Sequence, residues 1–232
     1  MSGQNELLLQ CASTGKISAQ RTSIGQLVIA GWTGRDPVAV EKHVRELEEI
    51  GVPRPKRTPI FYRVGASLLT TAEEIQVAGG DASGEVEFVL FSLADGLWVG
   101  VGSDHTDRKV EAVGVTLAKQ LCPKPVSTTV WRYADVQPHW DQLLLRSYAY
   151  TGEKKRLYQE GPVTAMRHPD DLMRLYAGEN ATLPEGYAMF CGTLTVKGAI
   201  EPAEVFAIEL EDPVLERKLT HAYKVVQLPV EG

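Results

Sequence analysis

The segment from Gly84 to His105, GEVEFVLFSLADGLWVGVGSDH, constrains the fold more strongly than the rest of the sequence. Two apolar runs flank Asp95-Gly96, a dipeptide typical of a two-residue β-hairpin loop. Counting outward from that loop places Glu87 directly opposite Asp104. Side chains alternate along a strand and directly opposed residues share a face, so three carboxylates converge at the open end of the hairpin. These are Glu85, Glu87 and Asp104.

The three carboxylates conflict with a buried hairpin unless a positive charge lies among them. Opposed like charges destabilise a sheet, and unpaired buried charges are costly. Carboxylate oxygens with positions left for water suit a hard cation such as Mg²⁺, Mn²⁺ or Ca²⁺. Alternatively, the hairpin ends at solvent and the acids lie on an exposed tip. A bulge at Gly100 or Gly102 would also shift the register by one and separate the faces.

Composition narrows the class of protein. The chain has 232 residues, and its net charge of -6 disfavours nucleic acid or an anionic membrane as a partner. The first residues lack the basic and apolar regions of a signal peptide, and no apolar stretch reaches the ~20 residues of a membrane helix. The three cysteines have no metal-site spacing. We therefore expect a cytoplasmic protein with reduced thiols.

Strands dominate the pattern along the chain, which predicts one mixed α+β fold rather than a parallel doubly wound sheet. Residues 12–25 read as a polar loop between two short strands. Residues 36–51 read as a helix capped by Asp36. A broken helix is expected over 105–121, a hairpin turning at Thr151-Gly152 over 141–161, and a short helix over 168–178. Further strands are expected at residues 60–64, 187–194, 204–212 and 218–228.

Several motifs in a fixed order resemble the fumarylacetoacetate hydrolase superfamily, from about Leu27 to Val226. They are PIFYRVGASLL, GEVEFVL, SDHTDR, LAKQLCP, LYQEG, TLPEGYAMFCGTL and AIEPAEVFAIELED. The resemblance implies a strand-dominated β-roll or sandwich of that family's C-terminal-domain type, with few helices. It also implies N-terminal strands and a lid helix in residues 1–58 and a catalytic domain in 59–232, unless the two form one continuous domain.

The same resemblance implies roles for individual residues. Family members bind a divalent metal through a Glu-x-Glu strand and a later Asp, which here are Glu85, Glu87 and Asp104. His43 and Glu46 match a His-x-x-Glu pair on the lid helix; the alternative is an exposed histidine. Lys119 matches a pocket lysine, the alternative being a solvated one. The expected substrate contacts are Arg63, Arg108, Gly192 and Thr193, although Arg108 could instead pair with Asp107 and Gly192-Thr193 could be an ordinary strand end.

Some features depart from the family pattern. The stretch from Gly31 to His43 is longer than in typical relatives, and the segment between Glu87 and Asp104 is shorter. Arg63 stands where relatives have lysine, and Glu111 stands near a position where many have glutamine. These departures indicate a divergent branch with its own substrate.

The resemblance implies a metal-dependent hydrolase that cleaves a carbon–carbon bond in a small 2-oxo or 2,4-dioxo carboxylate. His43, oriented by Glu46, would activate water, and Lys119 would stabilise an enolate. The alternatives at the same site are decarboxylation, hydration or tautomerisation. An alternative of another class is a metal- and ligand-binding protein without turnover. Relatives are commonly homodimers, so we expect a homodimer.

Overall fold

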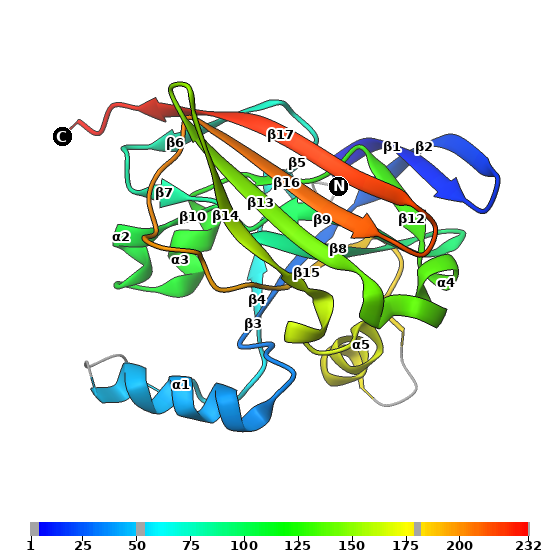
Figure 1. Ribbon diagram of the computed structural model, residues 1–232, viewed down its shortest axis with the longest axis horizontal. Helices are drawn as coiled ribbons and strands as arrows, with labels where there is room; N and C mark the ends of the chain where they lie inside the picture. Colours follow the sequence, from blue (N-terminus) through cyan, green and yellow to red (C-terminus); the bar gives the residue numbers. More distant parts are fainter. Residues whose placement is uncertain (1–4, 50–53, 179–181, 232) are drawn as a thin grey trace.

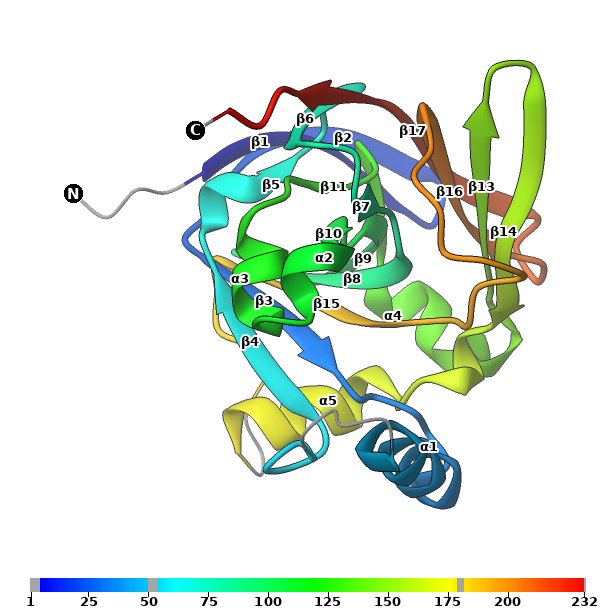
Figure 2. The same cartoon turned by 90° about the vertical axis from the view of Figure 1, so that its left-hand side faces the viewer.

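The computed structural model describes residues 5–49, 54–178 and 182–231, with all their side chains except those of His43, Glu46, Leu47 and Glu49. Two large β-sheets pack face to face, and the helices lie around their edges (Figures 1 and 2). A core cluster fills the space between the sheets, with Phe88 and Leu90 from one sheet against Phe206 and Ile208 from the other. The expected strand-dominated fold is confirmed.

The larger sheet carries the hairpin at its centre. Among the described residues it has eight strands, in the order β2-β1-β12-β9-β8-β15-β3-β4. Their bounds in that order are β2 (Lys16–Ile24), β1 (Asn5–Ser13), β12 (Thr129–Arg132), β9 (Gly96–Ser103), β8 (Val86–Leu93), β15 (Tyr187–Thr193), β3 (Gln26–Gly31) and β4 (Ile60–Val64).

Strand β8 is buried along its whole length because a hydrophobic cluster covers each face of the sheet. Phe88 and Leu90 enter the cluster between the two sheets, whereas Val89 and Phe91 enter a second cluster on the opposite face. A strand buried on both faces reads as a continuous apolar run rather than as an alternating pattern. This explains why the hairpin sequence is so apolar.

The smaller sheet covers one face of the hairpin. Within the described part of the chain its order is β14-β13-β16-β17-β6, namely β14 (Lys154–Pro162), β13 (Leu144–Thr151), β16 (Val205–Asp212), β17 (Arg217–Leu228) and β6 (Glu74–Ala78). Two short ladders pair β10 (Thr106–Asp107) with β7 (Ala82–Ser83) and β11 (Lys124–Pro125) with β5 (Leu69–Thr70).

The helices confirm the capping signals of the sequence. Their bounds are α1 (Pro37–Glu49), α2 (Arg108–Glu111), α3 (Val115–Gln120), α4 (Tyr133–Val136) and α5 (Pro169–Ala177), with 3₁₀ turns η1 (Ala66–Leu68), η2 (Gln137–Gln142) and η3 (Val163–Ala165). The Asp36 carboxylate accepts a 2.8 Å hydrogen bond from the N–H of Val38. Helix α5 ends at Gly178, whose φ is 98°. The broken helix is α2 followed by α3.

The interpretation of residues 12–25 as a polar loop is wrong, because most of this segment is strand β2. Strand β2 pairs with β1 along its whole length, from Asn5 opposite Ile24 to Ser13 opposite Lys16. It forms one edge of the larger sheet, and much of it is exposed. An edge strand with little buried surface lacks the apolar alternation that identifies a strand in sequence.

The hairpin register also differs from the sequence prediction. Leu93 pairs with Gly96, so the loop is Ala94-Asp95 and Glu87 lies opposite Gly102 rather than Asp104. The Asp95 carboxylate accepts a 2.8 Å hydrogen bond from the Trp98 indole, which holds it in the loop. The shift is two residues, and an even shift leaves every side chain on its predicted face.

Strands from residues 1–58 and from 59–232 share the larger sheet, and the division into these two segments stays a prediction. Helix α1 lies apart from α2 and α3, beyond the ends of β3 and β4 (Figures 1 and 2). In the described residues no helix has the length and apolar character that a membrane crossing requires.

The turn between β16 and β17 is organised by the buried carboxylate of Asp212. It accepts hydrogen bonds from the N–H groups of Val214 and Leu215 at 3.1 Å, from the Arg217 guanidinium at 3.1 Å, and it lies 2.9 Å from His139 Nε2. Burial alone would raise the pKa of Asp212, but the hydrogen bonds from His139, Leu215 and Arg217 outweigh burial and lower it. The ionised carboxylate therefore ties this turn to η2.

We predict that Asp212→Asn destabilises the protein at pH 7 by about 1–3 kcal/mol, the cost of leaving buried donors poorly paired. Because the folded-state pKa is lowered, the wild-type advantage is complete above the unfolded value of about 4 and is lost as the pH falls through the folded value. Urea unfolding of both proteins between pH 7 and pH 2.5 measures the difference. A difference that stays constant as the pH falls would contradict the ionised role of Asp212.

Candidate metal centre

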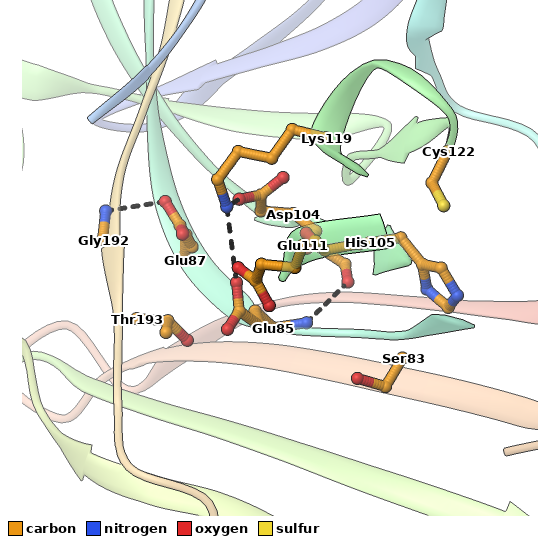
Figure 3. A network of polar contacts seen from close by, with 12 residues as sticks. Ser83, Glu85, Glu87, Asp104, His105, Glu111, Lys119, Cys122, Gly192 and Thr193 are labelled. Carbon is orange, nitrogen blue, oxygen red and sulfur yellow. Dashed lines mark hydrogen bonds and ion pairs between the residues drawn. The ribbon is translucent and has the colours of Figure 1, made fainter. Parts of the chain in front are cut away.

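The three predicted carboxylates meet at the open end of the hairpin (Figure 3). Glu85 immediately precedes β8, Glu87 lies on β8, and Asp104 immediately follows β9. One oxygen from each can be chosen such that all three lie within 4.8 Å of one another. Glu87 is 2% exposed and Asp104 is fully buried, so the acids do not sit on a solvent-exposed tip.

Glu87 is oriented by the backbone of the neighbouring strand β15. Its Oε2 accepts a 2.6 Å hydrogen bond from the N–H of Gly192. Pairing between β15 and β8 is irregular between Phe190 and Thr193, and this bulge turns the Gly192 N–H toward the carboxylate. Burial, together with the negative charge of Asp104, raises the pKa of Glu87 well above its usual range.

Asp104 lies between two ammonium groups. Lys119, on α3, donates a hydrogen bond to Asp104 Oδ2, and the Lys124 ammonium lies 3.5 Å from Oδ1. Burial would raise the pKa of Asp104, but the positive charges of Lys119 and Lys124 outweigh burial and lower it. Asp104 is therefore ionised although no solvent reaches it.

Glu85 is held by Arg108 at the start of α2. Arg108 Nη1 lies 3.2 Å from Glu85 Oε1 and 3.1 Å from Glu111 Oε2, and its Nε donates to Ser83 Oγ at 2.7 Å. The pairing of Arg108 with Asp107 that the sequence left open is not the arrangement found. Arg108 instead fixes one candidate ligand, and Glu111 completes its ion pairs.

The donor set fits a hard divalent cation. The candidate ligands are oxygens, which Mg²⁺, Mn²⁺ and Ca²⁺ prefer. Asp104 Oδ1 is buried, and no described residue donates a hydrogen bond to it. Buried polar atoms are normally satisfied, so the Asp104 carboxylate, whose Oδ1 has only the Lys124 charge at 3.5 Å, is still available to a further positive partner.

The structure does not bring all the predicted residues to this centre. Arg63 lies on β4 but points to the other side, where it is 3.3 Å from the Tyr176 hydroxyl and stacks over the Tyr187 ring. His43 and Glu46 belong to α1, as predicted, but their side chains lie outside those described. Their role as a dyad stays a prediction.

Gly192 and Thr193 lie at the centre, where their polar groups contact the protein. The Thr193 hydroxyl donates to the carbonyl of Val86 at 2.8 Å and accepts from Gln159 Nε2 at 2.8 Å. The N–H of Gly192 is directed at Glu87. In this arrangement both residues order the ligand strand, and their expected contact with substrate stays a prediction.

Sequence reasoning missed three side chains near the centre. Gln159 is fully buried on β14, accepts from the Val86 N–H at 2.9 Å and donates to Leu194 O at 2.6 Å, so it joins β8 to β15. Lys124, on β11, had no predicted role. Tyr62 alternates with Arg63 on β4; burial raises the pKa of its hydroxyl, and the positive charge of Lys119 acts in the opposite direction. The strand alternation of β4 was the available signal for Tyr62.

His105 follows Asp104 in the sequence but does not join the carboxylates. Its Nδ1 lies 3.0 Å from the Tyr223 hydroxyl, and that hydroxyl donates to Ser103 Oγ at 2.7 Å. Burial lowers the pKa of His105 to about 3, so the ring is neutral. His105 is thus part of the core beside the centre.

Gly192 meets two requirements that an alanine would violate. Its φ is +98°, a value that disfavours residues with a Cβ, and a Cβ added there would overlap Thr33 Oγ1. Gly178 has the same φ of +98°, with nothing within 4 Å of an added Cβ. The two glycines therefore separate the cost of the backbone conformation from the cost of the collision.

We predict that Gly178→Ala costs about 1–2 kcal/mol of unfolding free energy, from the backbone term alone. Gly192→Ala should cost about 1–3 kcal/mol more, because Thr33 must also move. Urea denaturation of both variants measures these values, and Thr33→Ala in the Gly192→Ala background should recover part of the loss. Equal costs for the two glycine variants would contradict close packing at Gly192.

Comparison with known proteins adds to this picture. Residues 30–223 match a family described as "Protein of unknown function (DUF2848)". No curated protein matches the sequence.

Solved structures share the fold at low sequence identity. Yeast ynq8, a fumarylacetoacetate hydrolase family protein, has a TM-score of 0.64 and 15% identity over 90% of this chain and 95% of its own. 5-Carboxymethyl-2-hydroxymuconate delta-isomerase from Mycobacterium smegmatis has a TM-score of 0.61 and 16% identity over 93% of this chain and 86% of its own. 2-Keto-3-deoxy-D-arabinonate dehydratase complexed with magnesium and 2,5-dioxopentanoate has a TM-score of 0.62 and 14% identity over 91% of this chain and 77% of its own. The chain therefore belongs to the DUF2848 family and has the fold of the fumarylacetoacetate hydrolase superfamily.

Proposed function

We propose that this protein is a divalent-cation-dependent enzyme that acts on a small 2-oxo or 2,4-dioxo carboxylate, with hydrolysis of a carbon–carbon bond as its reaction. The observation that carries the proposal is the buried cluster of Glu85, Glu87 and Asp104 with Lys119 directed into it. The similarity to an isomerase and to a dehydratase complexed with magnesium and a dioxo acid supports the same substrate class.

The carboxylates and the lysine of the centre would have different roles, because they carry opposite charges. Glu85, Glu87 and Asp104 would hold Mg²⁺, Mn²⁺ or Ca²⁺, which when bound supplies Lewis-acid stabilisation of a substrate oxygen. Burial alone would lower the pKa of the Lys119 ammonium, but the negative charges of Asp104 and Glu85 outweigh burial and raise it. Lys119 therefore stays charged, and it offers a fixed positive charge where negative charge develops on the substrate.

The residue that activates water is assigned from the sequence alone. His43 has the spacing to Glu46 that orients a general base on a helix surface, and the resemblance supplies the role. Decarboxylation, hydration and tautomerisation remain alternatives, because each needs the same stabilised enolate. A binding protein without turnover would have the same cation site but would leave 2-oxo and 2,4-dioxo carboxylates unchanged.

Glu87→Gln should lower cation affinity and turnover by at least about 100-fold, since even partners of metal ligands are worth 10–100-fold. It should not destabilise the protein, because it also removes repulsion from Glu85 and Asp104. Mn²⁺ titration, thermal unfolding and an assay of 2,4-dioxo acid cleavage measure the three effects. Glu74→Gln, which removes an exposed carboxylate beside Lys224, is the matched control. Wild-type Mn²⁺ affinity in Glu87→Gln would show that Glu87 is no ligand.

Oxalate should inhibit the enzyme competitively with its substrate. Three protein carboxylates leave about three positions on Mg²⁺ for water, and a planar dianion can displace two of them. Oxalate resembles the enolate of a 2-oxo acid in shape and charge, so it should bind more tightly than substrate. Initial rates at several oxalate concentrations test this with Mg²⁺ in excess, which prevents chelation from mimicking inhibition. The absence of inhibition at millimolar oxalate would exclude a substrate that chelates through two adjacent oxygens.

A further inference from the structure

The two ammonium groups that flank Asp104 are held in different ways. Lys124 lies on β11 with its side chain fully buried, and it donates to the carbonyls of His105 at 2.7 Å, Cys122 at 2.8 Å and Lys119. A lysine ammonium has three N–H donors, so all of them are used by these carbonyls. Lys124 is therefore fixed to the backbone, and it acts on Asp104 through its charge alone.

The contacts of Lys119 are of another kind. Its ammonium hydrogen-bonds Asp104 Oδ2 and lies 3.8 Å from Glu85 Oε2. Within the described part of the chain, these polar partners of the Lys119 ammonium are all carboxylates and belong to the candidate ligand set. Four rotatable methylenes join the charge to α3, so it can move without displacing the helix. Lys119 is the ammonium that can leave Asp104.

A divalent cation and the Lys119 ammonium require the same oxygens. Figure 3 shows the ammonium directed into the space between Glu87, Asp104 and Glu85. A cation bound among these three carboxylates would occupy the space into which the ammonium is directed, and two positive charges this close together would repel each other. The fixed ammonium of Lys124 cannot take over the role, because its donors are already satisfied.

We infer that Lys119 is an exchangeable counter-ion of the centre: its ammonium competes with the divalent cation for Asp104, and cation binding releases it to pair with the carboxylate of the substrate. This inference rests on the proposed function and specifies how its cation and anion sites are coupled. Lys119 opposes the cation when it is paired with Asp104 and favours the anion once it is released. The cation and the anion should consequently strengthen each other's binding, by the same factor in each direction.

Removal of the Lys119 charge should therefore have effects of opposite sign on the two ligands. Lys119→Met keeps an unbranched side chain, one heavy atom shorter than that of lysine, and deletes the competing charge. We expect it to bind Mn²⁺ about 10- to 100-fold more tightly than wild type, because a like charge and a competitor are both removed. With Mn²⁺ saturating, it should bind oxalate at least about tenfold more weakly, because the released ammonium is missing.

The experiment is a calorimetric or electron-paramagnetic-resonance titration of Mn²⁺, followed by oxalate, into wild type and three variants. Lys119→Arg retains a competing positive charge and should not show the tighter Mn²⁺ binding. Lys218→Met removes an exposed lysine that pairs with Glu209 at 3.1 Å on the other sheet, and both affinities should match wild type. If Lys119→Met does not fold, as judged by thermal unfolding, Lys119→Gln makes the same comparison.

The outcomes separate this inference from the proposed function. Tighter Mn²⁺ and weaker oxalate binding in Lys119→Met support the exchange. Unchanged or weaker Mn²⁺ binding in the folded neutral variants would overturn the exchange. If the wild-type protein nevertheless bound Mn²⁺, the metal centre of the proposed function would still stand. If wild type itself bound no Mn²⁺, the metal centre of the proposed function would fail, and the exchange would fail with it.

Discussion

Glu87 and Asp104 are buried at the end of a hairpin that is covered on both faces, so their charge must be balanced within the protein. Removing a balancing cation from such a buried cluster costs about 3–5 kcal/mol, because a carboxylate charge is left uncompensated. The balancing cations are Arg108, Lys119 and Lys124, which come from α2, α3 and β11. The segment that follows the hairpin is therefore folded against it by electrostatic necessity as well as by packing.

The rest of the fold keeps this cluster rigid. The second sheet covers the hairpin, and Gln159 from that sheet joins the edge of β8 to the end of β15. The bulge at Gly192 aims a backbone N–H at Glu87, which orients the carboxylate without adding a further charge. Ligands placed on central strands and supported by such partners are held more accurately than ligands placed on loops.

Local patterns in the sequence predicted much of this structure. Face alternation predicted the convergence of the three carboxylates, and it survived a two-residue error in register because the period of a strand is two. Capping residues predicted the start of α1 and the end of α5, whereas Gly51, the predicted end of α1, lies outside the described residues. Strand β2 was missed because an exposed edge strand needs no apolar face. Lys124 and Gln159 had no predicted role, although Gln159 belongs to the motif LYQEG, because most of their partners are backbone groups that only the tertiary fold brings together.

We propose that Glu85, Glu87 and Asp104 bind one divalent cation together. Anomalous scattering from a crystal saturated with Mn²⁺ would locate the ion. We expect one strong peak with carboxylate oxygens of all three residues within about 2.0–2.6 Å, the range for hard cations and oxygen ligands. A peak elsewhere, or saturated Mn²⁺ binding in solution with no peak among these carboxylates, would contradict it.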